Sequence, residues 1–179
     1  MADTVERLRS SFAGRDVQID VSQELPPVLV DEVYLDAILS NLLDNALKYS
    51  PEGAPVRVSA CRPPDGAEPA QAGAAAGLTQ AGAAGPDPDD GRPVRLVVED
   101  AGPGVPDEAL VRIFEKFYRT APVAAGSSAG GSRRGSGIGL AIVRGLTEAM
   151  GGTVVATRSP LGGLAVSVDL AATAPAGPS

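Results

Sequence analysis

The sequence contains no histidine, no tryptophan and a single cysteine, Cys61. The absence of histidine excludes Ser-His and Cys-His catalysis, histidine-ligated metals and a phosphoryl-accepting histidine within this chain. One cysteine excludes an intrachain disulfide framework and a cysteine-rich zinc site. No apolar run approaches the ~18 residues of a membrane-spanning helix, and residues 1–11 lack the apolar stretch of a secretory signal. We therefore expect a cytoplasmic location and no direct membrane contact.

Basic residues are also scarce. The 15 Lys and Arg residues are outnumbered by 22 Asp and Glu residues, which gives a net charge of −7. A general nucleic-acid binder needs a basic surface that releases counterions from phosphates, so we expect no nucleic-acid partner. Hydrophobic residues make up 44% of the 179 residues, which is enough for the core of one domain.

The abundant glycines and prolines, 22 and 16, indicate long loops. Residues 62–93 consist largely of Ala, Gly and Pro, with Leu78 as the only large aliphatic residue. This insert and the tail at 171–179 bury too little apolar surface to offset the entropy of ordering, so both are predicted to be disordered. Residues 120–134 are rich in Gly, Ser and Ala but separate two motif-dense segments, which favours a functional loop.

Hydrophobic patterns and stop signals predict interspersed helices and strands. Asp31 is the expected N-cap of the first helix, and Gly151 the expected end of the last. Helices are expected at 32–49, 106–118 and 138–150, and strands at 17–21, 28–30, 56–61, 94–99, 153–158 and 164–170. The fold class is therefore α/β or α+β: a two-layer sandwich in which a mixed sheet carries about three helices on one face.

The helix at 32–49 has one apolar and one polar face. The apolar face consists of Leu35, Ile38, Leu39, Leu42, Leu43, Ala46 and Leu47. Asn41, Asn45 and Lys48 are spaced i, i+4 and i+7, so they share the opposite face. Amide oxygens can ligate Mg²⁺ and an ammonium group attracts phosphate, so this row suits a metal-bound polyphosphate. A solvated polar face is the alternative.

Two glycine-rich segments also have features that suit the binding of a ligand. Asp100 lies at the end of a buried strand, where a carboxylate can accept a hydrogen bond from a ligand amino group. Gly102 and Gly104 follow it and allow the backbone to approach a flat ligand closely. An ordinary turn is the alternative. The segment 135–139, Gly-Ser-Gly-Ile-Gly, leads into a helix and leaves N–H groups free for an anion. It matches neither the dinucleotide pattern nor the Walker A pattern, so it is a phosphate site of another kind or a hinge.

Taken in order, four segments resemble the motifs of sensor histidine kinases. Residues 41–50 resemble the N box, 100–104 the G1 box, 113–119 the F box and 135–143 the G2 box. The resemblance covers about residues 17–170 and implies the ATP-binding catalytic domain of a histidine kinase, with the Bergerat fold of the GHKL ATPases such as gyrase and MutL. Residues 45–51, 114–119 and 144–152 look closest to the potassium-sensor (KdpD) type.

The resemblance implies a role for each motif residue. Asn45 would ligate Mg²⁺ with help from Asn41, and Lys48 would contact phosphate; these three form the implied catalytic set. Tyr49 would border the adenine pocket and Asp100 would accept a hydrogen bond from the adenine amino group. The phosphates would be held by the G2 segment, with Gly135, Gly137, Ile138, Gly139 and Leu140, and Gly102 and Gly104 would shape the adenine pocket.

The loop at 120–134 corresponds to an ATP lid. Phe114 and Phe117 would anchor it, although a plain core role suits them equally. Arg133 and Arg134 lie where a lid would bring a cation to the phosphates, or they form a solvated basic pair.

The implied activity is binding of Mg·ATP by a domain at 1–170 and donation of the γ-phosphate to a histidine on a separate dimerisation domain. A response regulator would act downstream. The chain lacks that histidine, which suggests a fragment of a larger kinase, with or without a membrane anchor, or a stand-alone protein. One alternative is an autonomous GHKL ATPase, but those carry a Glu general base where this chain has Asn41. The other is a stand-alone nucleotide-binding regulatory module.

Overall fold

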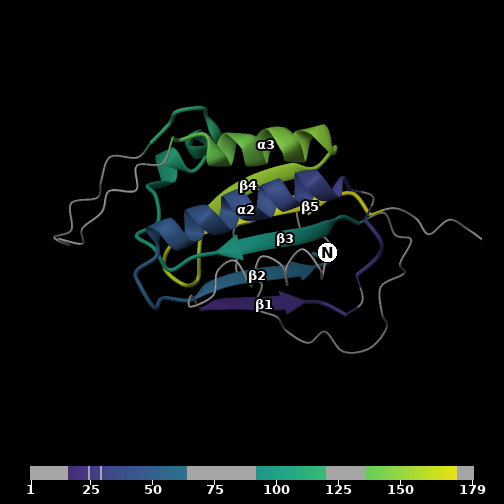
Figure 1. Ribbon diagram of the computed structural model, residues 1–179, viewed down its shortest axis with the longest axis horizontal. Coiled ribbons are helices and arrows are strands. Elements are labelled where there is room, and N and C mark those ends of the chain that lie inside the picture. The colour runs from purple at the N-terminus through teal and green to yellow at the C-terminus, as the bar shows by residue number, and fades with distance from the viewer. Residues whose placement is uncertain (1–15, 24, 29, 64–91, 120–135, 173–179) are drawn as a thin grey trace, which may run out of the picture.

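The computed structural model describes residues 16–23, 25–28, 30–63, 92–119 and 136–172. Its centre is a five-stranded sheet with the strand order β1-β2-β3-β5-β4 (Figure 1). The strands are β1 Val17–Val21, β2 Val56–Cys61, β3 Val94–Glu99, β4 Thr153–Arg158 and β5 Leu164–Leu170. β1 and β2 are parallel and the other neighbours are antiparallel, so the predicted mixed sheet is confirmed.

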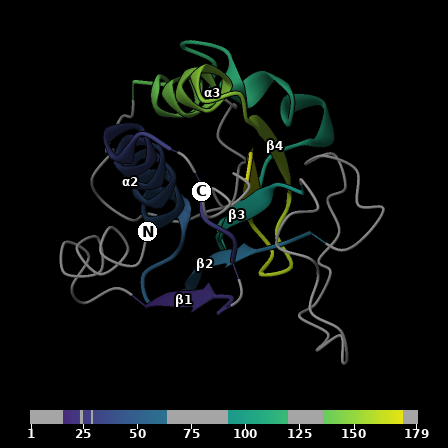
Figure 2. The same cartoon turned by 90° about the vertical axis from the view of Figure 1, so that its right-hand side faces the viewer.

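Two α-helices of the described chain pack on one face of this sheet: α2 Glu32–Tyr49 and α3 Gly139–Ala149. Figure 2 shows both helices on the same side of the strands. The predicted two-layer arrangement is therefore confirmed. None of the described helices is long and apolar enough to cross a membrane.

The bounds of α2 follow from its end groups. Asp31 Oδ1 accepts hydrogen bonds from the N–H groups of Val33 (2.8 Å) and Tyr34 (3.3 Å), as expected of an N-cap. At the other end Ser50 is extended and is followed by Pro51, which cannot continue a helix. The predicted apolar face is buried, with Ile38 and Leu39 both 0% exposed.

The core lies between this face of α2, part of α3 and alternate residues of the sheet. Val58 in β2, Val98 in β3 and Val166 in β5 stand side by side in the strand register and are all buried. On the other face of the sheet, Arg95 forms two hydrogen bonds to Asp169, at 2.6 and 2.8 Å. The bidentate pair links β3 to β5 where Asp169 is 4% exposed, so the carboxylate is buried with its charge neutralised.

Two predicted elements are wrong. At 28–30 the described residues, Val28 and Val30, belong to no strand; Val28 makes only an isolated bridge with Ala172, because Pro26 and Pro27 precede it and supply no N–H group to a ladder. The helix at 106–118 is replaced by two 3-10 turns, η1 Asp107–Ala109 and η2 Arg112–Phe114. The chain turns extended at Glu115 and left-handed at Phe117, which ends any helix there.

Most residues of the three low-complexity segments lie outside the described residues. This applies to 64–91, 120–135 and 173–179. The predictions of a disordered insert, a disordered tail and an ATP lid at 120–134 therefore stay predictions, as do the domain bounds. The described ends of the insert join β2 to β3, which are neighbouring antiparallel strands.

Candidate functional site

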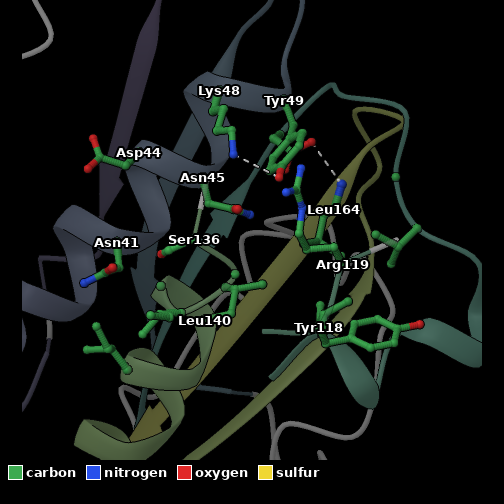
Figure 3. A pocket seen from close by; sticks show the side chains of 18 of the residues that line it. Asn41, Asp44, Asn45, Lys48, Tyr49, Tyr118, Arg119, Ser136, Leu140 and Leu164 are labelled. Atoms are coloured by element: carbon green, nitrogen blue, oxygen red, sulfur yellow. Dashed lines mark hydrogen bonds between the residues drawn. The ribbon is translucent and has the colours of Figure 1, made fainter. Parts of the chain in front are cut away.

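A cavity of about 690 Å³ opens between the end of α2, the end of β3 and the start of α3. Figure 3 shows side chains from these elements around it. Its walls are formed by Asn41, Asp44, Asn45, Lys48, Tyr49, Asp100, Pro103, Gly104, Val105, Ile113, Tyr118, Arg119, Ser136, Gly137, Ile138, Gly139, Leu140, Ile142 and Leu164. The N-box, G1 and G2 segments, which are far apart in the sequence, therefore meet in one place.

The two asparagines of α2 offer free oxygen atoms. The Asn41 side chain donates from Nδ2 to the Ala37 carbonyl at 2.7 Å, which leaves Oδ1 as its unused group. An ideal Cβ on Gly139 would lie 3.0 Å from that oxygen, so the first residue of α3 lies directly against Asn41. The Asn45 carboxamide makes no hydrogen bond within the described chain and lines the cavity one helical turn later.

This donor set fits Mg²⁺ held jointly with a ligand. The described residues contain no cluster of three or more His, Cys, Asp or Glu side chains that could hold a metal on their own. Mg²⁺ usually keeps several waters and takes few protein oxygens, with phosphates completing its shell. The carboxamide oxygens of Asn41 and Asn45 suit that role.

Lys48 and Tyr49 form a pair at the end of α2. The Lys48 ammonium lies 3.1 Å from the Tyr49 hydroxyl and 4.6 Å from the centre of its ring (Figure 3). The hydroxyl and the ring face thus hold the cation at the wall of the cavity. Arg119 contributes a second cation to the wall, and its guanidinium makes no ion pair within the described chain.

Asp100 is held in a backbone cradle at the end of β3. Its Oδ1 accepts hydrogen bonds from the N–H groups of Gly102 (2.8 Å) and Leu164 (3.1 Å). Burial raises the pKa of Asp100, while the hydrogen bonds from Leu164 and Gly102 act in the opposite direction. Its other oxygen, Oδ2, accepts no hydrogen bond from the described residues. Asp100 also lines the cavity, so a carboxylate fixed through one oxygen keeps the second available to a ligand.

Glycines around Asp100 leave no room for side chains. An ideal Cβ on Gly102 would lie 2.9 Å from both Asp100 Oδ1 and the Tyr49 carbonyl oxygen. On Gly163, in the β4–β5 turn, it would collide with Asp100 Oδ1. The Gly163 N–H also donates to the Asp100 carbonyl at 3.1 Å. Gly104 has a φ of 67°, which favours glycine over any side chain.

The start of α3 supplies N–H groups to the opposite end of the cavity. The first hydrogen bond of the helix runs from Ile142 N–H to the Ile138 carbonyl at 2.9 Å. Within the described chain the N–H groups of Gly139 and Leu140 have no partner. Helix N-termini of this kind attract anions through the unpaired N–H groups and the helix dipole.

Most of the implied site residues meet at this cavity. Those that line it are Asn41, Asn45, Lys48, Tyr49, Asp100, Gly104, Gly137, Ile138, Gly139 and Leu140. Gly102 lies behind Asp100 instead. Phe117 does not line the cavity: its side chain is 71% exposed, because the left-handed backbone turn places it outside the packed elements. Phe114 is a core residue, 7% exposed.

Three implied residues, Arg133, Arg134 and Gly135, lie outside the described residues. Conversely, the sequence reasoning missed Gly163 and Leu164, which belong to a hairpin distant in sequence from Asp100 and carry no local signal. It also assigned no role to Arg119, although that residue ends the F-box segment and lines the cavity.

The chain belongs to the family described as histidine kinase-, DNA gyrase B- and HSP90-like ATPases, which matches residues 30–174. More narrowly, its relatives are sensor kinases. The signal transduction histidine-protein kinase BaeS of Escherichia coli is 32% identical over 165 residues, which cover 90% of this chain and 28% of BaeS. The sensor protein KdpD of Mycobacterium tuberculosis is 33% identical over 156 residues, covering 87% of this chain and 14% of KdpD, consistent with the expected likeness to that type.

Solved structures agree with this placement. The mycobacterial sensor histidine kinase MprB has a TM-score of 0.62 and 26% identity, with 95% of this chain and 90% of that chain covered. Full-length ShkA, solved in complex with AMPPNP, has a TM-score of 0.63 and 31% identity, with 98% of this chain and 30% of ShkA covered. The chain thus spans less than a third of ShkA and of the two curated relatives above.

Proposed function

We propose that this domain binds Mg·ATP and donates the γ-phosphate to a histidine on a separate dimerisation domain. The observation that carries the proposal is that one cavity combines a cradled carboxylate at the end of β3 with the amide oxygens of α2, two cations and the N-terminus of α3. A purine with an amino group suits the carboxylate, and a triphosphate suits the amide oxygens, the cations and the helix N-terminus. The AMPPNP bound by ShkA supports the same ligand class.

At the adenine end, Asp100 Oδ2 would accept a hydrogen bond from the exocyclic amino group. The apolar side chains of Val105, Ile113 and Leu164 line the same cavity and would pack against the flat base. The Tyr49 ring, 48% exposed, would cover its outer side.

At the phosphate end, the carboxamide oxygens of Asn41 and Asn45 would hold Mg²⁺, which when bound offsets charge on the β- and γ-phosphates. Lys48 and Arg119 would supply point charges, and the first N–H groups of α3 would bind phosphate oxygens. Positioning and charge neutralisation of this kind are the main requirements of phosphoryl transfer.

A histidine acceptor fits this site better than water. Water needs a general base, and the Asn41 carboxamide cannot take a proton. Of the two carboxylates in the cavity wall, Asp100 is held by the Gly102 and Leu164 N–H groups, and in Figure 3 the Asp44 side chain points away from the Asn45 carboxamide. A neutral imidazole already carries a lone pair, which attacks the γ-phosphorus as the bond to ADP breaks.

The proposal also covers the partners of the domain and the compartment in which it works. The acceptor histidine would lie on a dimerisation domain of the same or a partner kinase, and a response regulator would receive the phosphoryl group in a two-component system. Since ATP is the substrate, the domain would work in the cytoplasm.

The test is to mix the chain with an isolated dimerisation–histidine domain and labelled ATP, and to measure acid-labile phosphohistidine on that domain. At ~100 times Kd, Mg·ATP should also stabilise the chain by about 2.7 kcal/mol. Asn45→Ala should abolish Mg-dependent binding and leave the nucleotide-free melting temperature unchanged. Gly145→Ala is the matched control: Gly145 is an exposed residue of α3, and an ideal Cβ on it would have nothing within 4 Å. Unchanged Mg·ATP affinity in Asn45→Ala would contradict the metal-ligand role.

A further inference from the structure

Phe117 has a backbone conformation that its residue type disfavours. With a φ of 66° it is the one non-glycine residue of the described chain in the left-handed region. This region brings Cβ close to the carbonyl oxygen, and bulky side chains avoid it. Residues held in such a conformation persist only where their surroundings impose it, and they concentrate at functional sites.

The left-handed backbone of Phe117 is held against Gly137. The Phe117 N–H donates to the Gly137 carbonyl at 3.0 Å, and the next N–H, of Tyr118, donates to the Glu115 carbonyl at 3.2 Å. Gly137 is also left-handed, with a φ of 70°. An ideal Cβ on it would lie 3.1 Å from the Tyr118 carbonyl oxygen and 3.2 Å from Phe117 Cα. The two backbones therefore touch with no side chain between them.

Both sides of this contact lead directly into the cavity. Tyr118 and Arg119 follow Phe117 and line the wall, and Tyr118 is further held by the Arg112 guanidinium, 4.5 Å above its ring. Ile138 and Gly139 follow Gly137 and form the start of α3. The Phe117 ring, in contrast, is 71% exposed and is absent from the wall.

Building on the proposed function, we infer that the Phe117–Gly137 backbone contact is a positioning device for the phosphate end of the site. It sets the backbone of Tyr118 and Arg119 and the N–H groups of α3 at a fixed separation, so that one polyphosphate meets both segments. The requirement falls on the backbone of Phe117 and not on its ring. Phe117 is thus a positioning residue that touches no nucleotide.

The test compares substitutions that differ in their tolerance of a left-handed backbone. Glycine adopts it freely and asparagine tolerates it, whereas valine is strongly disfavoured there. We expect Phe117→Gly and Phe117→Asn to bind Mg·ATP within about three-fold of the native affinity, and Phe117→Val to bind at least about ten-fold more weakly. If the glycine and asparagine variants were weakened as much as the valine variant, the ring would be responsible and the inference would be wrong. Native affinity in Phe117→Val would also overturn it.

Gly137→Ala tests the other side of the contact and should bind Mg·ATP at least about ten-fold more weakly, because its methyl group meets the Tyr118 carbonyl. Gly53→Ala is the matched control. Gly53 is also left-handed, with a φ of 78°, but its Cβ would have nothing within 4 Å and it lies outside the cavity wall. Gly53→Ala should therefore keep the native affinity. If Phe117→Val does not fold, the comparison of Gly137→Ala with Gly53→Ala still tests the inference.

Amide hydrogen exchange without nucleotide separates this inference from the proposed function. The residue 117 amide should be protected in the native chain and in Phe117→Asn, and should exchange faster in Gly137→Ala. A native chain that binds no Mg·ATP would overturn the proposed function alone. An unprotected residue 117 amide in the native chain would overturn the contact as a positioning device.

Discussion

Replacing Asp100 by Asn would change one atom of the site in a predictable orientation. The N–H groups of Gly102 and Leu164 both donate to Oδ1, at 2.8 and 3.1 Å, so the amide oxygen of Asn must occupy that position. The amide nitrogen then replaces Oδ2 and faces the cavity with donors. An adenine amino group, itself a donor, would lose its acceptor, whereas a guanine carbonyl oxygen would gain a partner.

The size of the effect follows from the hydrogen bond that is lost. A hydrogen bond to a charged group contributes about 1.5–3 kcal/mol. At 1.4 kcal/mol for each factor of ten, ATP affinity should fall about 10- to 150-fold in Asp100→Asn. GTP affinity should rise or stay constant. Isothermal titration with both nucleotides measures this, and an equal loss of ATP and GTP binding would refute the adenine role of Asp100.

The stability of the nucleotide-free chain should rise in Asp100→Asn, although its ATP affinity falls. Because burial raises the pKa of Asp100 above its unfolded value, protonation of this carboxyl favours the folded state. This contribution to folding stability is fully present below the pKa that the carboxyl has in the unfolded chain, and it is lost as the pH rises through its pKa in the folded chain. At pH 7 the buried charge therefore costs stability, and Asp100→Asn should melt at a higher temperature than the native chain. The difference in melting temperature between Asp100→Asn and the native chain should become smaller toward pH 4. If Asp100→Asn were less stable than the native chain at pH 7, the cradle would depend on the carboxylate.

Three further predictions concern other parts of the chain. Thr147→Val should stabilise the fold by about 1 kcal/mol in a denaturant titration, because Thr147 is 0% exposed and its hydroxyl has no hydrogen-bond partner among the described residues; a loss of stability would mean that the hydroxyl is satisfied. Replacing residues 62–93 by a short glycine-containing turn should leave ATP affinity and melting temperature nearly unchanged, since loop closure changes by only about 0.6 kcal/mol per doubling of length; a large fall in either would show that the insert packs on the domain. Asn41→Glu should raise intrinsic ATP hydrolysis at saturating ATP by up to about 10²–10⁴-fold. An ideal Cβ on Gly139 would lie 3.0 Å from Asn41 Oδ1, so α3 leaves little room for the longer Glu side chain and limits the gain. Rapid hydrolysis by the native chain would favour an autonomous ATPase.

Local sequence patterns were sufficient to predict features that lie within a single helix or strand. Asp31 as a cap and the leucine stripe predicted α2 with its observed bounds, and the 3.6-residue period placed Asn41 and Asn45 together on the cavity side. Hydrophobic patterns and stop signals likewise predicted β1 to β5 with their observed bounds. Helix and strand periods depend on neighbours within a few residues, so the sequence alone can reveal them.

Contacts between distant segments account for what could not be predicted. Gly163 reaches Asp100 only after the β4–β5 hairpin pairs with β3, and nothing near residue 163 indicates this. Phe117 follows a segment with helical composition, yet its backbone is left-handed because it meets Gly137, twenty residues later. In both cases tertiary packing overrides the local preference.

The construction of the Asp100 cradle has a consequence for resistance to inhibitors. Its surroundings are backbone N–H groups from Gly102 and Leu164, together with two glycines, Gly102 and Gly163, where any side chain would collide with Asp100. Point mutations replace side chains and leave backbone donors in place, so this end of the cavity offers few ways to exclude a competitive inhibitor and still admit ATP. Escape variants selected against a small adenine mimic should therefore arise at Tyr49, Ile113 or other wall side chains. A compound that contacts only Asp100 and the cradle should be the slowest to lose potency.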